Sequence, residues 1–302
     1  MKIKIACLLL LIALISQSFF SFSRTASIYP IFDSNRIHLA KLRTSQVGSA
    51  KSGLNVQGLN NLRASGSEQF SEDTFGEIVR SLAITPEKLV IFDLRQESHG
   101  FINGKSVSWF DGNFNYANVH KTRSEIEMDE YQRLKLAAQS KQIIIDPVES
   151  STKLNVHTVK TERNVVEENG SIYVRMPVTD HNHPSNQTID QFIEFITTLP
   201  QDKWIHFHCK GGKGRTSTFL ALYDIIKNCK HVSFDEILAR QKFIGGYDLN
   251  HVSRGDSERS RAAQERRAFV EKFYTYCRQN PNFQTSWSNW VERKDSIAAV
   301  AQ

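Results

Sequence analysis

The sequence predicts an α/β fold in which a central, mainly parallel sheet is flanked by helices. Its second half alternates short apolar runs with segments of helical spacing, in the order strand, helix, strand, helix. That order is typical of parallel sheets, because a helix returns the chain before the next parallel strand begins. The 302 residues and 40% hydrophobic content are sufficient for one large domain or two modest ones with a sizeable core.

Residues 1–23 have the pattern of a secretory signal. Lys2 and Lys4 precede an apolar run over residues 5–20, and Ser21-Phe22-Ser23 supplies small residues for cleavage. A membrane anchor is the alternative, but the run is short and contains serine and glutamine. We therefore expect a cleaved signal peptide and an exported protein, periplasmic or secreted, with no stable membrane anchor.

The rest of the chain divides into three parts. Residues 24–60 are a polar lead-in with little pattern, residues 61–290 are expected to form the main domain, and residues 291–302 a C-terminal tail. Within the main domain the apolar patterns predict strands at 88–94, 142–146, 172–178 and 203–207. They predict helices at 125–140, 161–169, 187–198, 217–227 and 256–277. A further helix is expected to begin at a capping box formed by Ser233 and Glu236 and to end at Gly245-Gly246.

The most distinctive stretch is HCKGGKGRT, residues 208–216, which joins an apolar strand to an apolar helix. Ligands of α/β sheets bind where the strands end. Gly211, Gly212 and Gly214 permit a backbone whose amides turn inward around an anion. The following helix adds its positive N-terminus. The loop therefore predicts an anion site.

Four side chains in this loop indicate phosphate chemistry. The positive field favours a thiolate at Cys209, and the thiolate is the nucleophile. The planar fork of Arg215 holds two phosphate oxygens. His208 is expected to fix the loop, and Thr216 to donate a hydrogen bond to the sulfur. Together they suit attack of sulfur on phosphorus.

Three other interpretations of the loop are possible. A buried cysteine beside a glycine turn is the simplest, but it does not require the arginine and threonine. A Walker nucleotide loop is excluded, because Gly214 stands where serine or threonine is needed. A sulfur-transfer loop of the rhodanese type fits poorly with His208, Arg215 and Thr216.

The number of cysteines allows one disulfide bond within the chain. Signal cleavage would leave Cys209, Cys229 and Cys277, an odd number. Cys229 and Cys277 could bridge each other in an oxidising compartment, which would leave Cys209 free. The sequence does not decide whether that bridge forms.

A general acid is needed to protonate the leaving oxygen. Asp180 follows a predicted strand and precedes a helix, a place from which a loop can reach the same sheet edge. An aspartate in a turn or a helix cap is the ordinary alternative, and spacing leaves the two open.

Several separate motifs give the chain a family resemblance. These are LRASGSEQFS (62–71), IFDLRQESHGFINGKSVSW (91–109), TERNVVEENGSIYVRMPVTDH (161–181), TLPQDKWIHFHC (198–209) and ILARQKFIGG (237–246). Over residues 60–290 the chain resembles the bacterial cysteine phytases, the tyrosine-phosphatase-like inositol polyphosphatases within the cysteine-based phosphatases.

The resemblance implies a tyrosine-phosphatase-like core with a small β-rich subdomain. It implies that Asp180 is the acid and that Gln241 positions water, although a glutamine on a helix surface is the ordinary reading. It offers further phosphate contacts at Arg63, Arg95, Lys121 and His181. No metal or cofactor is implied.

Two loop residues depart from the family pattern. Lys210 and Lys213 stand where the cysteine phytases tend to carry acidic or apolar residues. In this respect the loop sequence is more similar to that of the 3-phosphoinositide lipid phosphatases. Lysines that simply point to solvent are the alternative. Arg254, Arg259 and Arg261, near the start of the last long helix, are expected to form a solvated face.

These observations predict a phosphatase of inositol polyphosphates that acts through a phosphocysteine. Its partner is a highly anionic, phosphorylated small molecule, and no nucleic acid is expected. The alternatives are a phosphoinositide or phosphotyrosine-protein phosphatase, including one that acts on a host cell, and a phosphate-binding module without chemistry. The presence of cysteine, arginine and aspartate together argues against the last.

Overall fold

The computed structural model describes residues 28–33, 38–47, 53–112, 115–251 and 255–300 and confirms the α/β fold. The signal predicted for residues 1–23 lies outside these ranges. The central sheet has the strand order β10-β4-β11-β3-β2. Its strands are β2 (Arg43–Thr44), β3 (Ala64–Ser67), β4 (Leu89–Arg95), β10 (Ile172–Val178) and β11 (Trp204–His208). All are parallel except β2, which pairs antiparallel with β3.

Both faces of this sheet are buried, which explains why its strands read as continuous apolar runs. Side chains alternate along a strand. Leu89 and Ile91 of β4 therefore join the core on one face, while Val90 and Phe92 join the core on the other.

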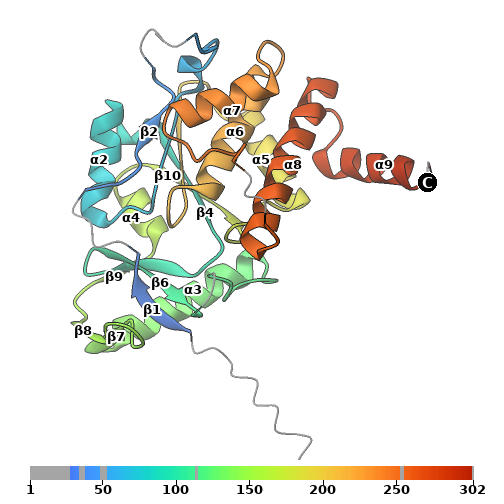
Figure 1. The fold of residues 1–302 in the computed structure, drawn as a ribbon. Coiled ribbons are helices and arrows are strands. Elements are labelled where there is room, and N and C mark those ends of the chain that lie inside the picture. Colours follow the sequence, from blue (N-terminus) through green and yellow to red (C-terminus); the bar gives the residue numbers. More distant parts are fainter. Residues whose placement is uncertain (1–27, 34–37, 48–52, 113–114, 252–254, 301–302) are drawn as a thin grey trace, which may run out of the picture.

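Helices cover the two faces unequally (Figure 1). One face packs against α2 (Glu72–Leu82) and α4 (Glu162–Glu168). The larger core on the other face is completed by α5 (Asn186–Thr198), α6 (Gly214–Asn228), α7 (Phe234–Phe243), α8 (Glu258–Gln279) and α9 (Trp287–Val300). The capping box predicted at Ser233 and Glu236 is present at the start of α7.

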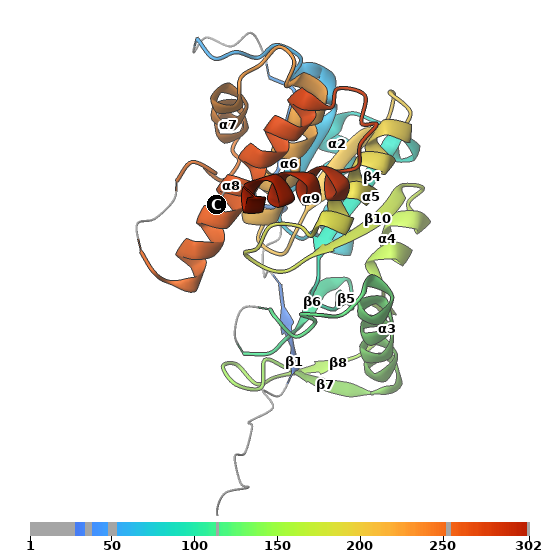
Figure 2. The same cartoon turned by 90° about the vertical axis from the view of Figure 1, so that its right-hand side faces the viewer.

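A second, smaller sheet lies beside the core (Figures 1 and 2). It is antiparallel, with the order β1-β6-β5-β9. Its strands are β1 (Tyr29–Phe32), β5 (His99–Ile102), β6 (Lys105–Phe110) and β9 (Val159–Lys160), and it is accompanied by α3 (Arg123–Gln139) and the hairpin β7 (Gln142–Ile145) and β8 (Thr152–Asn155). Ile102, Val107 and Leu134 help to form its separate core. The predicted β-rich subdomain is thus confirmed.

The boundaries of the predicted lead-in and tail need correction. Residues 24–60 contribute β1 to the small sheet and β2 to the central sheet. These strands are too short to show a period of two in the sequence. The predicted tail, 291–302, begins inside α9, where Val291 packs into the main core.

Two further predictions concern membranes and thiols. None of the helices in the described ranges is both long and apolar enough to cross a membrane. Cys209, Cys229 and Cys277 are all buried and free, so the structure lacks the bridge that the sequence left open between Cys229 and Cys277.

The parallel strands bring the important loops to one edge. Glu68, Gln96, Thr179 and Cys209 follow β3, β4, β10 and β11 respectively. Because these strands are parallel, the four positions lie at the same, carboxyl edge of the sheet.

Candidate active site

The cysteine loop occupies the middle of that edge, since β11 lies between β4 and β3. Cys209 is only 3% exposed. Gly212 has φ 62°, and a Cβ there would lie 2.4 Å from the Glu68 nitrogen. Both the positive φ and the close backbone therefore require glycine at this position.

Cys209 lies just before the N-terminus of α6. The hydroxyl of Thr216 donates to its Sγ at 3.1 Å, which is the contact expected from the sequence. Lys213 is the N-cap residue, and its side chain makes no capping hydrogen bond. The first-turn amides of α6 therefore remain available to an anion at the positive end of the helix.

Arg215 is held in place by Glu97, which was not among the site residues expected from the sequence. Nη1 and Nη2 donate to the two carboxylate oxygens of Glu97 at 2.7 and 3.0 Å. Burial opposes the charge of Arg215, but Glu97 and Asp180 outweigh it and raise its pKa well above the usual value. Its Nε is buried and has no hydrogen-bond partner among the described residues, so it is a donor available to a phosphate oxygen.

Asp180 reaches the same place from the end of β10. Its Oδ1 lies 3.0 Å from Nη2 of Arg215, and its side chain is 19% exposed. Its Oδ2 accepts a hydrogen bond from Nδ2 of Asn115 at 2.8 Å. The structure therefore places Asp180 beside the cysteine loop, which spacing alone left open.

Cys209 and Asp180 line one cavity of about 600 Å³. Its basic lining residues are Lys41, Lys210, Lys213, Arg215, Arg259 and Arg266, and its acidic ones are Asp33, Glu68 and Asp180. This excess of positive charge favours an anionic ligand. Arg259 is exposed, as expected of a solvated helix face, and it also lines this cavity from the start of α8.

Each of the two loop lysines lies in the cavity wall. Nζ of Lys210 donates to Ser108 Oγ at 3.3 Å and to Asn115 Oδ1 at 3.2 Å, and burial lowers its pKa. Lys213 is exposed. His181 also lines the cavity, with its Nε2 3.7 Å from Asp180 Oδ2. Burial, the largest effect, lowers the pKa of His181 despite that carboxylate.

The lead-in supplies two cations that sequence reasoning missed. Nζ of Lys41 donates to the Gly211 carbonyl at 2.9 Å. Arg43 donates to the Gly212 carbonyl at 2.9 Å and to Ser217 Oγ at 3.0 Å. Both steady the cysteine loop. No sequence pattern marks them, because their partners lie about 170 residues further on.

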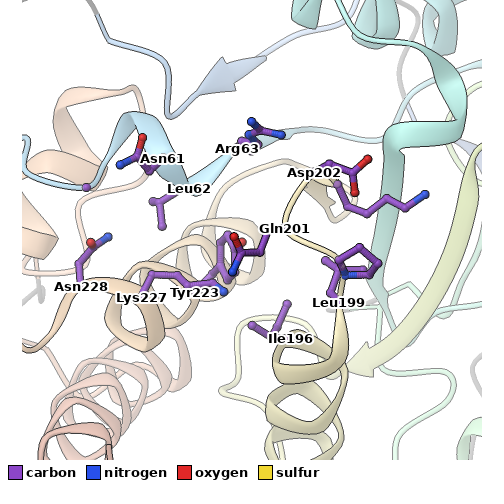
Figure 3. Close-up of a pocket in the computed structure, with 13 residues that line it drawn as sticks. Asn61, Leu62, Arg63, Ile196, Leu199, Gln201, Asp202, Tyr223, Lys227 and Asn228 are labelled. Atoms are coloured by element: carbon purple, nitrogen blue, oxygen red, sulfur yellow. The ribbon is translucent and has the colours of Figure 1, made fainter.

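Arg63 does not lie in this cavity. It precedes β3, at the opposite edge of the sheet, and lines a separate cavity of about 660 Å³ with Gln201, Tyr223 and Lys227 (Figure 3). Parallel strands place residues before and after a strand at opposite edges. Arg63 is therefore not a contact for a phosphate held by the Cys209 loop.

Three other predicted contacts are engaged elsewhere. Arg95 is fully buried and pairs with Asp33 and Glu97. Lys121 bonds to Asn118 and Asp129 and lines a different cavity. Gln241 is 2% exposed and donates to Asp224. Of these, Arg95 acts on the site indirectly, through Glu97.

His208 lies behind the loop rather than in the cavity. Its Nε2 is 2.7 Å from Oε1 of Glu162, and its ring packs against Phe70 at a centroid distance of 5.2 Å. Burial alone would raise the pKa of Glu162, but His208 lowers it to about 2. This contact supports the structural role predicted for His208.

A buried polar cluster continues behind His208. Within the described ranges, Asp93, His99 and Glu162 are close enough to share a metal ion. Their oxygens, however, already accept hydrogen bonds from Tyr173 and Gln69. Both ring nitrogens of His99 face oxygen atoms, Nδ1 that of the Glu97 carbonyl at 2.9 Å and Nε2 that of Glu162 at 3.1 Å. This arrangement suits a charged imidazolium.

We expect the fold to become less stable in alkali, because His99 loses this charge there. Burial and the nearby Arg95 and Arg175 would lower the pKa of His99, but Asp93, and then Glu130, raises it to about 10. Stabilisation by a raised pKa is complete below the unfolded value, about 6.5, and is lost as the pH rises through the folded value. Urea unfolding of the wild type between pH 7 and 10.5 should show this loss, and His99→Gln should show a flatter curve. Parallel curves would contradict the assignment.

A buried thiol at a helix N-terminus, an arginine beside it and an aspartate facing both constitute the active-site architecture of the cysteine-dependent phosphatases. Comparison with known proteins narrows the class. The family model of the PTP-like phytases, described as inositol hexakisphosphate, matches residues 92–227.

Among solved structures, the PTP-like phytase of Bdellovibrio bacteriovorus is 33% identical with a TM-score of 0.71, covering 88% of this chain and 95% of that one. The PTP-like myo-inositol phosphatase of Mitsuokella multacida, solved with myo-inositol-(1,3,4,5)-tetrakisphosphate, is 33% identical with a TM-score of 0.81. That match covers 89% of this chain and 48% of the Mitsuokella chain. This protein belongs to the PTP-like phytase family.

Two curated proteins of Pseudomonas and Xanthomonas are also similar to this chain. Effector protein hopD2 of Pseudomonas syringae pv. tomato is 26% identical over 82% of this chain. The uncharacterized protein AvrBs1.1 of Xanthomonas campestris pv. campestris is 40% identical, but over 31% of this chain. The chain spans 55% of hopD2 and thus about half the length of that curated relative.

Proposed function

We propose that this protein is a cysteine-dependent phosphatase that removes phosphate groups from inositol polyphosphates. The observation that carries the proposal is one cavity that unites Cys209, Arg215 and Asp180 with a surplus of lysine and arginine. A ligand with several phosphates can pair with several of these cations, whereas a single phosphotyrosine leaves most of them without an anionic partner. Family membership and the inositol phosphate in the Mitsuokella structure support the same substrate class.

The geometry suggests a two-step reaction. In the first step the Cys209 thiolate attacks phosphorus, the P–S bond forms and the P–O bond to inositol breaks. Nε of Arg215 and the amides of the loop hold the non-bridging oxygens. The protonated carboxyl of Asp180 gives its proton to the leaving oxygen.

In the second step water hydrolyses the phosphocysteine. Asp180, now a carboxylate, takes a proton from the water as its oxygen attacks phosphorus and the P–S bond breaks. Inorganic phosphate leaves and the thiolate is restored. No redox change occurs in either step.

A second substrate class is a phosphoinositide or a phosphotyrosine protein. Lys210 and Lys213 in the loop and the relative named as an effector favour this alternative. Phosphate release from phytate, a soluble phosphoinositide and a phosphotyrosine peptide would separate the classes. Turnover on the peptide alone would overturn the inositol proposal.

Asp180→Asn tests the assigned acid. We expect kcat on phytate to fall by about 100- to 10,000-fold, the usual contribution of a general acid. The loss on p-nitrophenyl phosphate should be much smaller, because nitrophenolate leaves without a proton. An equal loss on both substrates would contradict the role of Asp180 as acid.

We also infer that the protein is exported. The pattern of residues 1–23 supports this, as does the relative named as an effector. N-terminal sequencing of the mature protein from the producing cells should begin after Ser23. An intact N-terminus in those cells would contradict the inference.

A further inference from the structure

Asn115 bridges the two loops on which the proposed reaction depends. It lies beyond β6 and is 9% exposed. Its Nδ2 donates to Asp180 Oδ2 at 2.8 Å, and its Oδ1 accepts from Nζ of Lys210 at 3.2 Å. One amide therefore joins the residue assigned as the acid to a lysine of the cysteine loop.

The orientation of this amide follows from its partners. Lysine has only donors, and a carboxylate has only acceptors. The amide oxygen must therefore face Lys210 and the amide nitrogen must face Asp180. The backbone of Asn115 has φ 61°, a left-handed conformation that asparagine adopts more readily than most residues. Both the side chain and the backbone thus suit asparagine.

The bridge is anchored on the small sheet. Lys210 also donates to Ser108 of β6 and lies 5.4 Å from the ring centroid of Phe110. Its Nζ is 3.7 Å from Oδ1 of Asp33, a residue that is itself held by Arg95. The small sheet thereby determines where Lys210 and the Asn115 amide lie.

Arg215, the other partner of Asp180, is also expected to bind the phosphate. Nη2 of Arg215 pairs with Asp180, but a phosphate seated on the cysteine loop competes for the same guanidinium. Asn115 has no such competing role, because its Oδ1 accepts from Lys210 and its Nδ2 already donates to the carboxyl group of Asp180. During turnover it can continue to hold Asp180 when Arg215 turns to phosphate.

We propose that Asn115 is a positioning residue that holds Asp180 in line with the leaving oxygen, with Lys210 anchoring its amide. The proposal rests on the proposed function, because it needs a reaction in which Asp180 gives up a proton. It assigns to the small sheet a part in catalysis, the orientation of the acid. A carboxyl group displaced by about 1 Å loses much of its catalytic effect.

The test compares two leaving groups in two variants. Asn115→Asp keeps the shape and the backbone preference but replaces the donor with a carboxylate. Asn115→Gly removes the side chain and still tolerates the positive φ. We expect both to lower kcat on phytate by about 10- to 100-fold. On p-nitrophenyl phosphate kcat should change by less than about threefold, because that substrate needs no acid.

Two controls separate positioning from a general structural effect. Asn103→Gly is the matched control: Asn103 also has a positive φ, 52°, and its side chain donates to the Asn155 carbonyl in the β7–β8 hairpin, outside the cavity. It should leave the ratio of the two activities unchanged. In an Asp180→Asn background, Asn115→Gly should change that ratio no further. Thermal unfolding by circular dichroism checks that each variant is folded.

Four results would overturn or remove the basis for the positioning role of Asn115. Ratios within about threefold of wild type for both Asn115 variants would overturn the positioning role. So would equal losses on both substrates, or an additive effect in the Asp180→Asn background. A wild type inactive on both substrates would instead refute the proposed function, and the positioning role would fail with it.

Discussion

Replacing Cys209 with serine is expected to abolish phosphate release, with kcat on phytate lower by at least about 10,000-fold. The hydroxyl of serine is far less acidic than a thiol, so the loop that favours a thiolate cannot favour an alkoxide to the same extent. The side chain is almost isosteric, and Thr216 can still donate to it. Steady-state assays on phytate and p-nitrophenyl phosphate measure the loss.

The same variant should still bind its ligand. Arg215, the amides of the loop and the other cations of the cavity remain, so isothermal titration with phytate should give a dissociation constant close to that of wild type. Residual turnover above about 1% would show that another group is the nucleophile. Loss of binding together with activity would indicate a damaged loop rather than a missing nucleophile.

Arg215→Met is expected to remove both activity and stability. Catalysis loses the guanidinium that faces the transferring phosphate, which we expect to cost about 1,000-fold in kcat/KM. Stability falls because the fully buried carboxylate of Glu97 loses its bidentate partner. Breaking a buried pair in this way costs about 3–5 kcal/mol of unfolding free energy. Urea unfolding and phosphate release measure the two effects independently.

A double variant separates those effects. Glu97→Gln removes the buried charge that Arg215→Met leaves behind, so Arg215→Met with Glu97→Gln should recover much of the stability. It should recover none of the activity, since no guanidinium returns. Arg215→Lys is the matched charge control and keeps a cation without the fork. Recovery of activity in the double variant would disprove the direct role of Arg215.

The cysteine loop and its chemistry could be predicted from local sequence. An apolar strand, a loop with glycines at 211, 212 and 214, and an apolar helix must run in succession, so residues 208–216 indicate their own structure. The strands predicted at 88–94 and 172–178 are present as β4 and β10 for the same reason, because a strand buried on both faces is a short apolar run. The place of Asp180 after such a strand made it a candidate, but its role as the acid was implied by the family resemblance and not by spacing.

The remaining site residues depend on contacts that are distant along the chain. Lys41 and Arg43 come from a segment without pattern, yet they donate to the carbonyls of Gly211 and Gly212. The local sequence around Glu97 does not distinguish it from a surface glutamate, because its role depends on its contact with Arg215 in the folded chain. Asn115 acquires its partners only when the small sheet packs beside the core.

By itself, the sequence of this protein determined the α/β class, and it predicted a phosphate-binding loop with Cys209 as the proposed nucleophile, because each is encoded in neighbouring residues. The tertiary structure alone decided which cations share the cavity and which do not. Arg63 and Cys209 both adjoin strands of one sheet, but one precedes β3 and the other follows β11. Parallel pairing of those strands puts the two residues at opposite edges, and that pairing is a property of the folded chain rather than of either segment.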